Sequence, residues 1–186
     1  STSVSEKGQH AMKAAICTSL DHTIPFAQVI PMVREAGFEV VSIGANPQHS
    51  GYTTTRGRAA IRRLIETYGM AIDSVHAPFP EGDRLFSLDA AERLESLRQC
   101  QTAVDTAGEI GGKIVVIHLI QPYDIPEGDV RNQMIDEGRR SVSQLAAYAS
   151  SRGVKLALEN GQRRAYDQVL AGLLTEFSEA HIGFCY

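Results

Sequence analysis

The segment from Lys113 to Ile120 reads KIVVIHLI, and it decides the class of fold. Its centre, Ile114 to Ile117, consists of four consecutive β-branched residues with no polar position between them. A short continuous apolar run is typical of a strand that is covered on both faces, as in a parallel sheet. His118 follows the run directly. The segment therefore predicts a buried parallel strand with an ionisable side chain near its carboxyl end.

Five further apolar runs alternate with segments of helical period along the chain. One helical segment carries apolar residues at helical spacing from Phe26 to Val33, and Pro31 is expected to kink this helix or delay its start. A longer helix is expected to be capped near Asp89 and to stop at Gly111. Strand, helix and strand in succession predict an α/β fold with a parallel sheet and right-handed crossovers. The five runs are residues 13–20, 39–44, 70–79, 154–160 and 181–186.

Two architectures fit this alternation, an open doubly wound sheet and a closed (β/α)8 barrel. Six strands in 186 residues suit the open sheet. The runs begin about 34 residues apart, so eight such units need roughly 270 residues, close to the ~250 of a TIM barrel. No glycine-rich phosphate loop follows the first run at Cys17 to Asp21, which disfavours a dinucleotide-binding fold. Composition and spacing leave the two architectures open.

The composition excludes several classes of protein. A hydrophobic fraction of 43% in 186 residues is enough for one domain with a buried core. No apolar run reaches the ~18 residues that a membrane helix needs, so we expect no membrane partner. The net charge of −4 makes nucleic acid an unlikely partner, because binding to a phosphate backbone requires a basic face.

The cysteines and the first residues give expectations about compartment and domain limits. Cys17, Cys100 and Cys185 are too few and too scattered for a disulfide framework, so we expect reduced thiols in a cytoplasmic protein. Cys17 and Cys185 fall within predicted strands and are expected to be buried. Residues 1–11 are polar and lack periodicity, so we interpret them as a disordered leader or tag. The folded domain is then expected at residues 12–186.

Ionisable side chains end three of the predicted strands. His76, His118 and Glu159 each follow an apolar run. Because the carboxyl ends of parallel strands meet at one edge of the sheet, these side chains are expected to converge. Two imidazoles and a carboxylate form a donor set for a divalent cation such as Zn²⁺ or Mn²⁺.

Other interpretations of these residues remain open from the sequence alone. Either histidine could be a hydrogen-bonded structural residue, and Glu159 could form a salt bridge with Arg163 or Arg164. His22 and His49 lie in predicted loops after the first and second strands, where they could reach a substrate or be solvated.

The strand ends resemble those of the xylose isomerase-like barrel superfamily. The resemblance rests on HAPF at 76–79, VVIH at 115–118 and LALEN at 156–160, and it runs from about Lys13 to the last residue. This superfamily includes sugar phosphate isomerases and epimerases, inosose-dehydratase-like proteins and endonuclease IV. The resemblance favours a (β/α)8 TIM barrel. It also implies that the chain is truncated after the sixth strand, one residue before a metal-ligating Asp.

The resemblance further implies roles for the three strand-end residues. Glu159 matches a metal ligand and would also be a catalytic acid/base group. His76 and His118 match positions that bind substrate, or that ligate metal if the site is multinuclear. The implied cofactor is a divalent ion, Mn, Mg, Co or Zn. The implied reaction of the intact parent protein is isomerisation or epimerisation of a sugar or polyol through an enediolate.

Two other functions remain open beside this one. The first is metal-dependent phosphodiester hydrolysis as in endonuclease IV, which is disfavoured because Leu119 and Ile120 stand where that branch has Pro-Gly. The second is a non-catalytic barrel fragment whose own site is incomplete. Ser42 also stands where many sugar-acting relatives carry a Glu, which leaves the substrate open. A partial barrel has two open sheet edges, so a homo-oligomer is expected.

Overall fold

The computed structural model describes residues 13–121 and 123–186. The predicted leader at 1–11 lies outside the described residues. The strands are β1 (Ala15–Cys17), β2 (Val40–Ile43), β3 (Ala71–His76), β4 (Ile114–Ile117), β5 (Lys155–Glu159) and β6 (Ile182–Cys185). The helices are α1 (Phe26–Glu35), α2 (Pro47–Ser50), α3 (Thr55–Tyr68), α4 (Ala90–Ile110), α5 (Asp129–Ser151) and α6 (Arg164–Glu176), with a 3-10 turn η1 (Thr18–Leu20) after β1.

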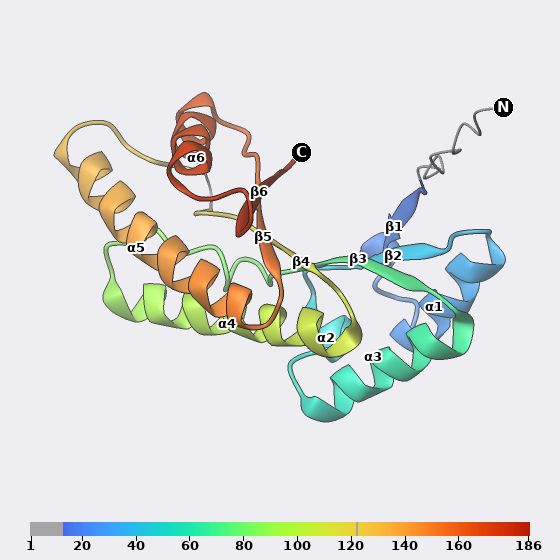
Figure 1. Ribbon diagram of the computed structural model, residues 1–186. Coiled ribbons are helices and arrows are strands. Elements are labelled where there is room, and N and C mark those ends of the chain that lie inside the picture. Colours follow the sequence, from blue (N-terminus) through green and yellow to red (C-terminus); the bar gives the residue numbers. More distant parts are fainter. Residues whose placement is uncertain (1–12, 122) are drawn as a thin grey trace, which may run out of the picture.

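The six strands form one parallel sheet in the order β1-β2-β3-β4-β5-β6. Each strand pairs with its successor in the sequence, and the order never reverses as it does in a doubly wound sheet. The sheet is curved, and α3, α4 and α5 lie along its outer side (Figure 1). Among the described residues β1 pairs only with β2 and β6 only with β5. The predicted barrel architecture is therefore confirmed for six consecutive strands.

The main core lies between the sheet and its outer helices. Val115 and Ile117 of β4 are fully buried, as are Leu156 and Leu158 of β5. Val104 on α4 is fully buried as well. The uninterrupted apolar run of β4 therefore marks a strand covered on both faces, as predicted.

The predicted helix boundaries are confirmed at both ends of α4. The Asp89 carboxylate accepts hydrogen bonds from the amides of Ala91 and Glu92 at 2.8 and 3.1 Å, and Gly111 ends the helix with a φ of 90°. In α1 the helix begins at Phe26 and Pro31 lies inside it, so the proline does not delay its start. Burial of Val29, Ile30 and Val33 offsets the one backbone hydrogen bond that a proline removes.

The prediction that Cys17 and Cys185 are buried is wrong. Cys17 is exposed and Cys185 is only half-buried, while Cys100 on α4 is buried. Cys17 and Cys185 end β1 and β6, the first and last strands of the sheet. A strand at the end of a sheet has a neighbour on one side only, so its side chains are less covered than those of a central strand.

None of the helices in the described ranges is long and apolar enough to cross a membrane.

Candidate functional site

The three predicted strand-end residues come together at one edge of the sheet. His76 is the last residue of β3, His118 follows β4, and Glu159 is the last residue of β5. Glu159 Oε2 lies 2.7 Å from His118 Nε2 and 3.0 Å from His76 Nε2. The two imidazole rings meet edge to face, with centroids 4.9 Å apart. Each side chain therefore directs one donor atom to a common point.

The other nitrogen of each imidazole is held by an acceptor. His76 Nδ1 lies 2.6 Å from the carbonyl oxygen of Ala77. His118 Nδ1 lies 3.0 Å from Asp83 Oδ2. A carbonyl or an ionised carboxylate only accepts hydrogen bonds, so each Nδ1 carries a proton and donates it. In both histidines Nε2 is thus the nitrogen that is aimed at Glu159.

Hydrogen bonds within this cluster favour the charged forms of His118 and Glu159. Burial by itself lowers the pKa of His118, but hydrogen bonds to Asp83 and Glu159 outweigh it and raise the pKa to about 9. Hydrogen bonds from His118 and His76 lower the pKa of Glu159 to about 2 against the opposing effect of burial. A proton on His118 therefore offsets the negative charge of the Glu159 carboxylate.

Asp83 is a member of the site that the sequence reasoning missed. It lies in the loop between β3 and α4 and is 1% exposed. The loop holds it tightly, because the Asp83 carbonyl accepts from the amide of Gln121 at 3.1 Å and the neighbouring Gly82 carbonyl accepts from Ser96 Oγ at 2.5 Å. Gly82 is needed here, since a Cβ atom would lie 2.3 Å from the carbonyl oxygen of Pro78. The available signal was the charged pair Asp83 and Arg84 directly before the apolar pair Leu85 and Phe86.

Tyr166 on α6 is a second residue that the sequence reasoning missed. Its hydroxyl accepts from the amide of Leu119 at 2.8 Å and donates to the carbonyl oxygen of Glu159 at 3.3 Å. The side chain is fully buried. It therefore joins the ends of β4 and β5, directly beside His118 and Glu159.

The alternative salt bridge of Glu159 is not what the structure shows. Glu159 contacts the two imidazoles, whereas Arg163 lies 3.7 Å from Asp124.

Among the loop histidines, His49 Nε2 is 2.8 Å from the carbonyl oxygen of Ile24, a local structural contact. His22 packs against His49 with ring centroids 5.0 Å apart and also lines a cavity.

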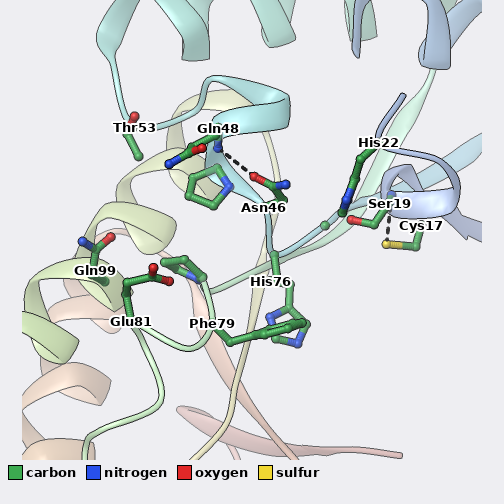
Figure 2. A pocket seen from close by; sticks show the side chains of 14 residues that line it. Cys17, Ser19, His22, Asn46, Gln48, Thr53, His76, Phe79, Glu81 and Gln99 are labelled. Atoms are coloured by element: carbon green, nitrogen blue, oxygen red, sulfur yellow. Dashed lines mark hydrogen bonds between the residues drawn. The ribbon is translucent and has the colours of Figure 1, made fainter. Parts of the chain in front are cut away.

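A cavity of about 670 Å³ adjoins the cluster on the side of β1 and β2. His76 and Phe79 lie on one side of it, and Asn46 and Gln48 lie on another (Figure 2). Its remaining polar lining includes Glu81, and the lining residues include no lysine or arginine. The cavity can thus accept a small molecule that carries several hydrogen-bonding groups and places one end at His76.

The donor set fits a divalent cation. Two imidazole nitrogens and a carboxylate oxygen, from His76, His118 and Glu159, all lie within 4.8 Å of one another. Imidazole nitrogen and carboxylate oxygen suit Zn²⁺, Mn²⁺ and Co²⁺ in proteins. Both histidines are also held through Nδ1, as metal-ligating histidines usually are.

Comparison with known proteins concerns the fold of the chain. The chain superposes on a D-tagatose 3-epimerase-like protein with a TM-score of 0.77 at 21% sequence identity, covering 93% of this chain and 64% of that one. D-psicose 3-epimerase from Clostridium cellulolyticum H10, determined with D-tagatose, gives a TM-score of 0.73 at 15% identity and coverages of 93% and 62%. A xylose isomerase-like TIM barrel protein from Mycobacterium smegmatis, in complex with magnesium, gives 0.66 at 16% identity and coverages of 94% and 64%.

At these identities the superpositions establish the fold, and the chain spans a little under two thirds of the length of these three proteins. No curated protein matches the sequence. The family model described as xylose isomerase-like TIM barrel matches residues 30–186. On that match, and on six barrel strands in sequential order, the chain belongs to the xylose isomerase-like TIM barrel family.

Proposed function

We propose that this chain belongs to a metal-dependent isomerase or epimerase of a small sugar or polyol. The observation that carries the proposal is the convergence of two imidazole Nε2 atoms on one oxygen of Glu159, with both Nδ1 atoms already engaged as donors. The epimerases among the superposed structures support the reaction class.

Glu159, His118 and His76 would hold the cation. A bound divalent ion supplies polarisation of a substrate carbonyl and stabilises negative charge that develops beside it. A proton-transfer group works best with a pKa near the operating pH, whereas the pKa of Glu159 is held at about 2. Of the two roles proposed for Glu159, its low pKa therefore supports that of ligand more strongly than that of acid/base group.

The residues that line the adjoining cavity indicate the chemical class of the substrate. Recognition of a phosphate normally uses arginine or lysine, and among the described residues neither lines this cavity. Asn46, Gln48 and Thr53 offer amide and hydroxyl groups instead. The lining supports a neutral polyhydroxylated substrate over a phosphorylated sugar, and it offers no basic surface for a nucleic acid.

The three free cysteines support a cytoplasmic location, which we include in the proposal.

The test is metal binding by the chain and by its Glu159→Gln variant. Titration of Mn²⁺ or Co²⁺ in a calorimeter is expected to show one saturable site in the wild type. Glu159→Gln removes the only carboxylate of the cluster's donor set, so we expect its dissociation constant to rise at least about tenfold. Ion at 100 times the dissociation constant stabilises the native state by about 2.7 kcal/mol, so the wild type should also melt at a higher temperature with the ion.

A matched control is Glu66→Gln, which removes a carboxylate whose side chain is 60% exposed and which lies near the end of α3, where β3 begins, rather than at the carboxyl ends of the strands. This variant should bind the ion as the wild type does. Equal binding by Glu159→Gln and the wild type would remove the basis of the proposal.

A further inference from the structure

We propose that Asp83 is a positioning residue of the cation site, which holds His118 with its proton on Nδ1 and its Nε2 lone pair directed to the ion. The inference rests on the proposed function, because it concerns the same site. It adds a residue that lies outside the three strand ends.

The contact between Asp83 and His118 is almost completely shielded from water. Asp83 Oδ2 lies 3.0 Å from His118 Nδ1, and the two side chains are 2% and 6% exposed. The nearest comparison is His76, whose Nδ1 donates to the backbone carbonyl of Ala77. Both imidazoles direct Nε2 to Glu159, but Nδ1 is held by a carboxylate in His118 and by a backbone carbonyl in His76.

The chemistry of the imidazole explains why this contact matters for a cation. In a neutral imidazole one nitrogen carries a proton and the other carries a lone pair. A hydrogen-bond acceptor beside one nitrogen keeps the proton there, so the lone pair is on the other nitrogen. A carboxylate accepts and cannot donate, so Asp83 fixes the proton on Nδ1. Nε2, which lies 2.7 Å from Glu159 Oε2, is then the nitrogen whose proton an ion would displace and whose lone pair it would meet. A carboxylate partner also makes the imidazole a stronger base and a better ligand.

The position of the Asp83 side chain is set by hydrogen bonds of its own backbone. The Asp83 amide donates to the carbonyl oxygen of Pro80 at 3.1 Å, and the Asp83 carbonyl accepts from Gln121. On either side, Ser96 Oγ donates to the Gly82 carbonyl and accepts from the Arg84 amide at 3.0 Å. These anchors do not involve the Asp83 carboxylate, so replacing the carboxylate leaves them in place.

The test compares Asp83→Asn with Ser96→Ala in the full chain. An asparagine of the same size can turn its NH2 group toward His118 Nδ1, which leaves the one imidazole proton on Nε2 and blocks the ligand atom, as the corresponding change does in a Ser-His-Asp triad. We expect Asp83→Asn to raise the Co²⁺ dissociation constant by about 10- to 100-fold. Ser96→Ala loosens the same loop without touching the imidazole and should change it by less than about threefold.

A second measurement separates positioning from a merely structural role. In the metal-free chain labelled with ¹⁵N-histidine, NMR should show His118 Nδ1 protonated in the wild type and in Ser96→Ala. In Asp83→Asn it should show Nδ1 without its proton, while Nε2, which faces the Glu159 carboxylate, keeps one. Circular dichroism melting of all three proteins accounts for any loss of folding.

Three results would overturn the inference: unchanged Co²⁺ affinity in Asp83→Asn, an equal loss in Ser96→Ala, or Nδ1 still protonated in Asp83→Asn. If no version of the chain binds Co²⁺, the proposed function fails. The NMR comparison then decides the inference by itself, since Asp83 holds the Nδ1 proton of His118 whether or not an ion is bound.

Discussion

Tyr166 shows how one buried hydroxyl can set the geometry of the whole site. It accepts from the Leu119 amide and donates to the Glu159 carbonyl, so it ties together the two strand ends that carry His118 and Glu159. Its burial raises the pKa of the phenol well above its usual range, so the group stays protonated and can donate. Asp83 has the comparable task of holding the His118 ring itself.

Replacing Tyr166 by phenylalanine is expected to destabilise the chain. The ring stays, but the Leu119 amide loses its 2.8 Å partner inside the protein, and an unpaired buried donor costs about 1–3 kcal/mol. Urea unfolding followed by circular dichroism measures the difference. Tyr68→Phe, at a residue that is 36% exposed, is the control and should change the unfolding free energy by less than about 0.5 kcal/mol. Equal stability of the Tyr166→Phe and wild-type chains would contradict this account.

At the scale of elements, a close contact joins α5 to the loop after β3. A Cβ atom on Gly138 would lie 2.3 Å from the ring of Phe86, which is fully buried. The helix therefore brings its backbone directly against the aromatic face. The contact packs the loop that carries Asp83 against the outer helical layer, so packing supports the site from outside the sheet.

Gly138→Ala and Gly172→Ala are expected to act in opposite directions. Alanine favours a helix over glycine by about 1 kcal/mol at both positions. At Gly138 the new methyl group meets the Phe86 ring, and overpacking of this kind costs about 1–3 kcal/mol, so the variant should be less stable. At Gly172, on α6, no atom lies within 4 Å of the added Cβ, so that variant should be more stable. Urea midpoints of the two variants test the difference, and a stabilised Gly138→Ala would show that Phe86 can move aside.

The whole molecule is a curved sheet with two strands that lack a second neighbour among the described residues. Figure 1 shows β1 and β6 at its two ends, with β6 next to the C-terminus. Unpaired amide and carbonyl groups of an edge strand readily pair with another chain. Phe184 on β6 is 52% exposed and adds an apolar side chain to that edge.

We therefore expect the 186-residue chain to self-associate through these edges. Light scattering after size-exclusion chromatography should give a mass above the 20.2 kDa of one chain, rising with concentration. A charge on an edge strand opposes pairing, so Phe184→Lys should shift the population toward the monomer. Leu94→Lys, at a position on α4 that is 66% exposed, is the matched control and should leave the mass unchanged. A monomeric wild type at high concentration would refute the expectation.

The sequence by itself determined the six strands, their parallel pairing and the convergence of His76, His118 and Glu159. The physical reason is that these features are local. Apolar runs and helical periods can be recognised from the order of residues, and the residue that follows an apolar run lies at the end of the strand. The family resemblance also followed from those strand ends, and the family match confirms it.

Only the tertiary structure decided which groups hold the site in place. Asp83 lies 35 residues from His118 in the sequence, and Tyr166 lies 47 residues from Leu119. No local pattern links such pairs, because their contact depends on how a loop and a helix pack on the sheet. The exposure of Cys17 was mispredicted for the same reason, since an apolar run shows a strand but does not show whether a neighbouring strand covers it.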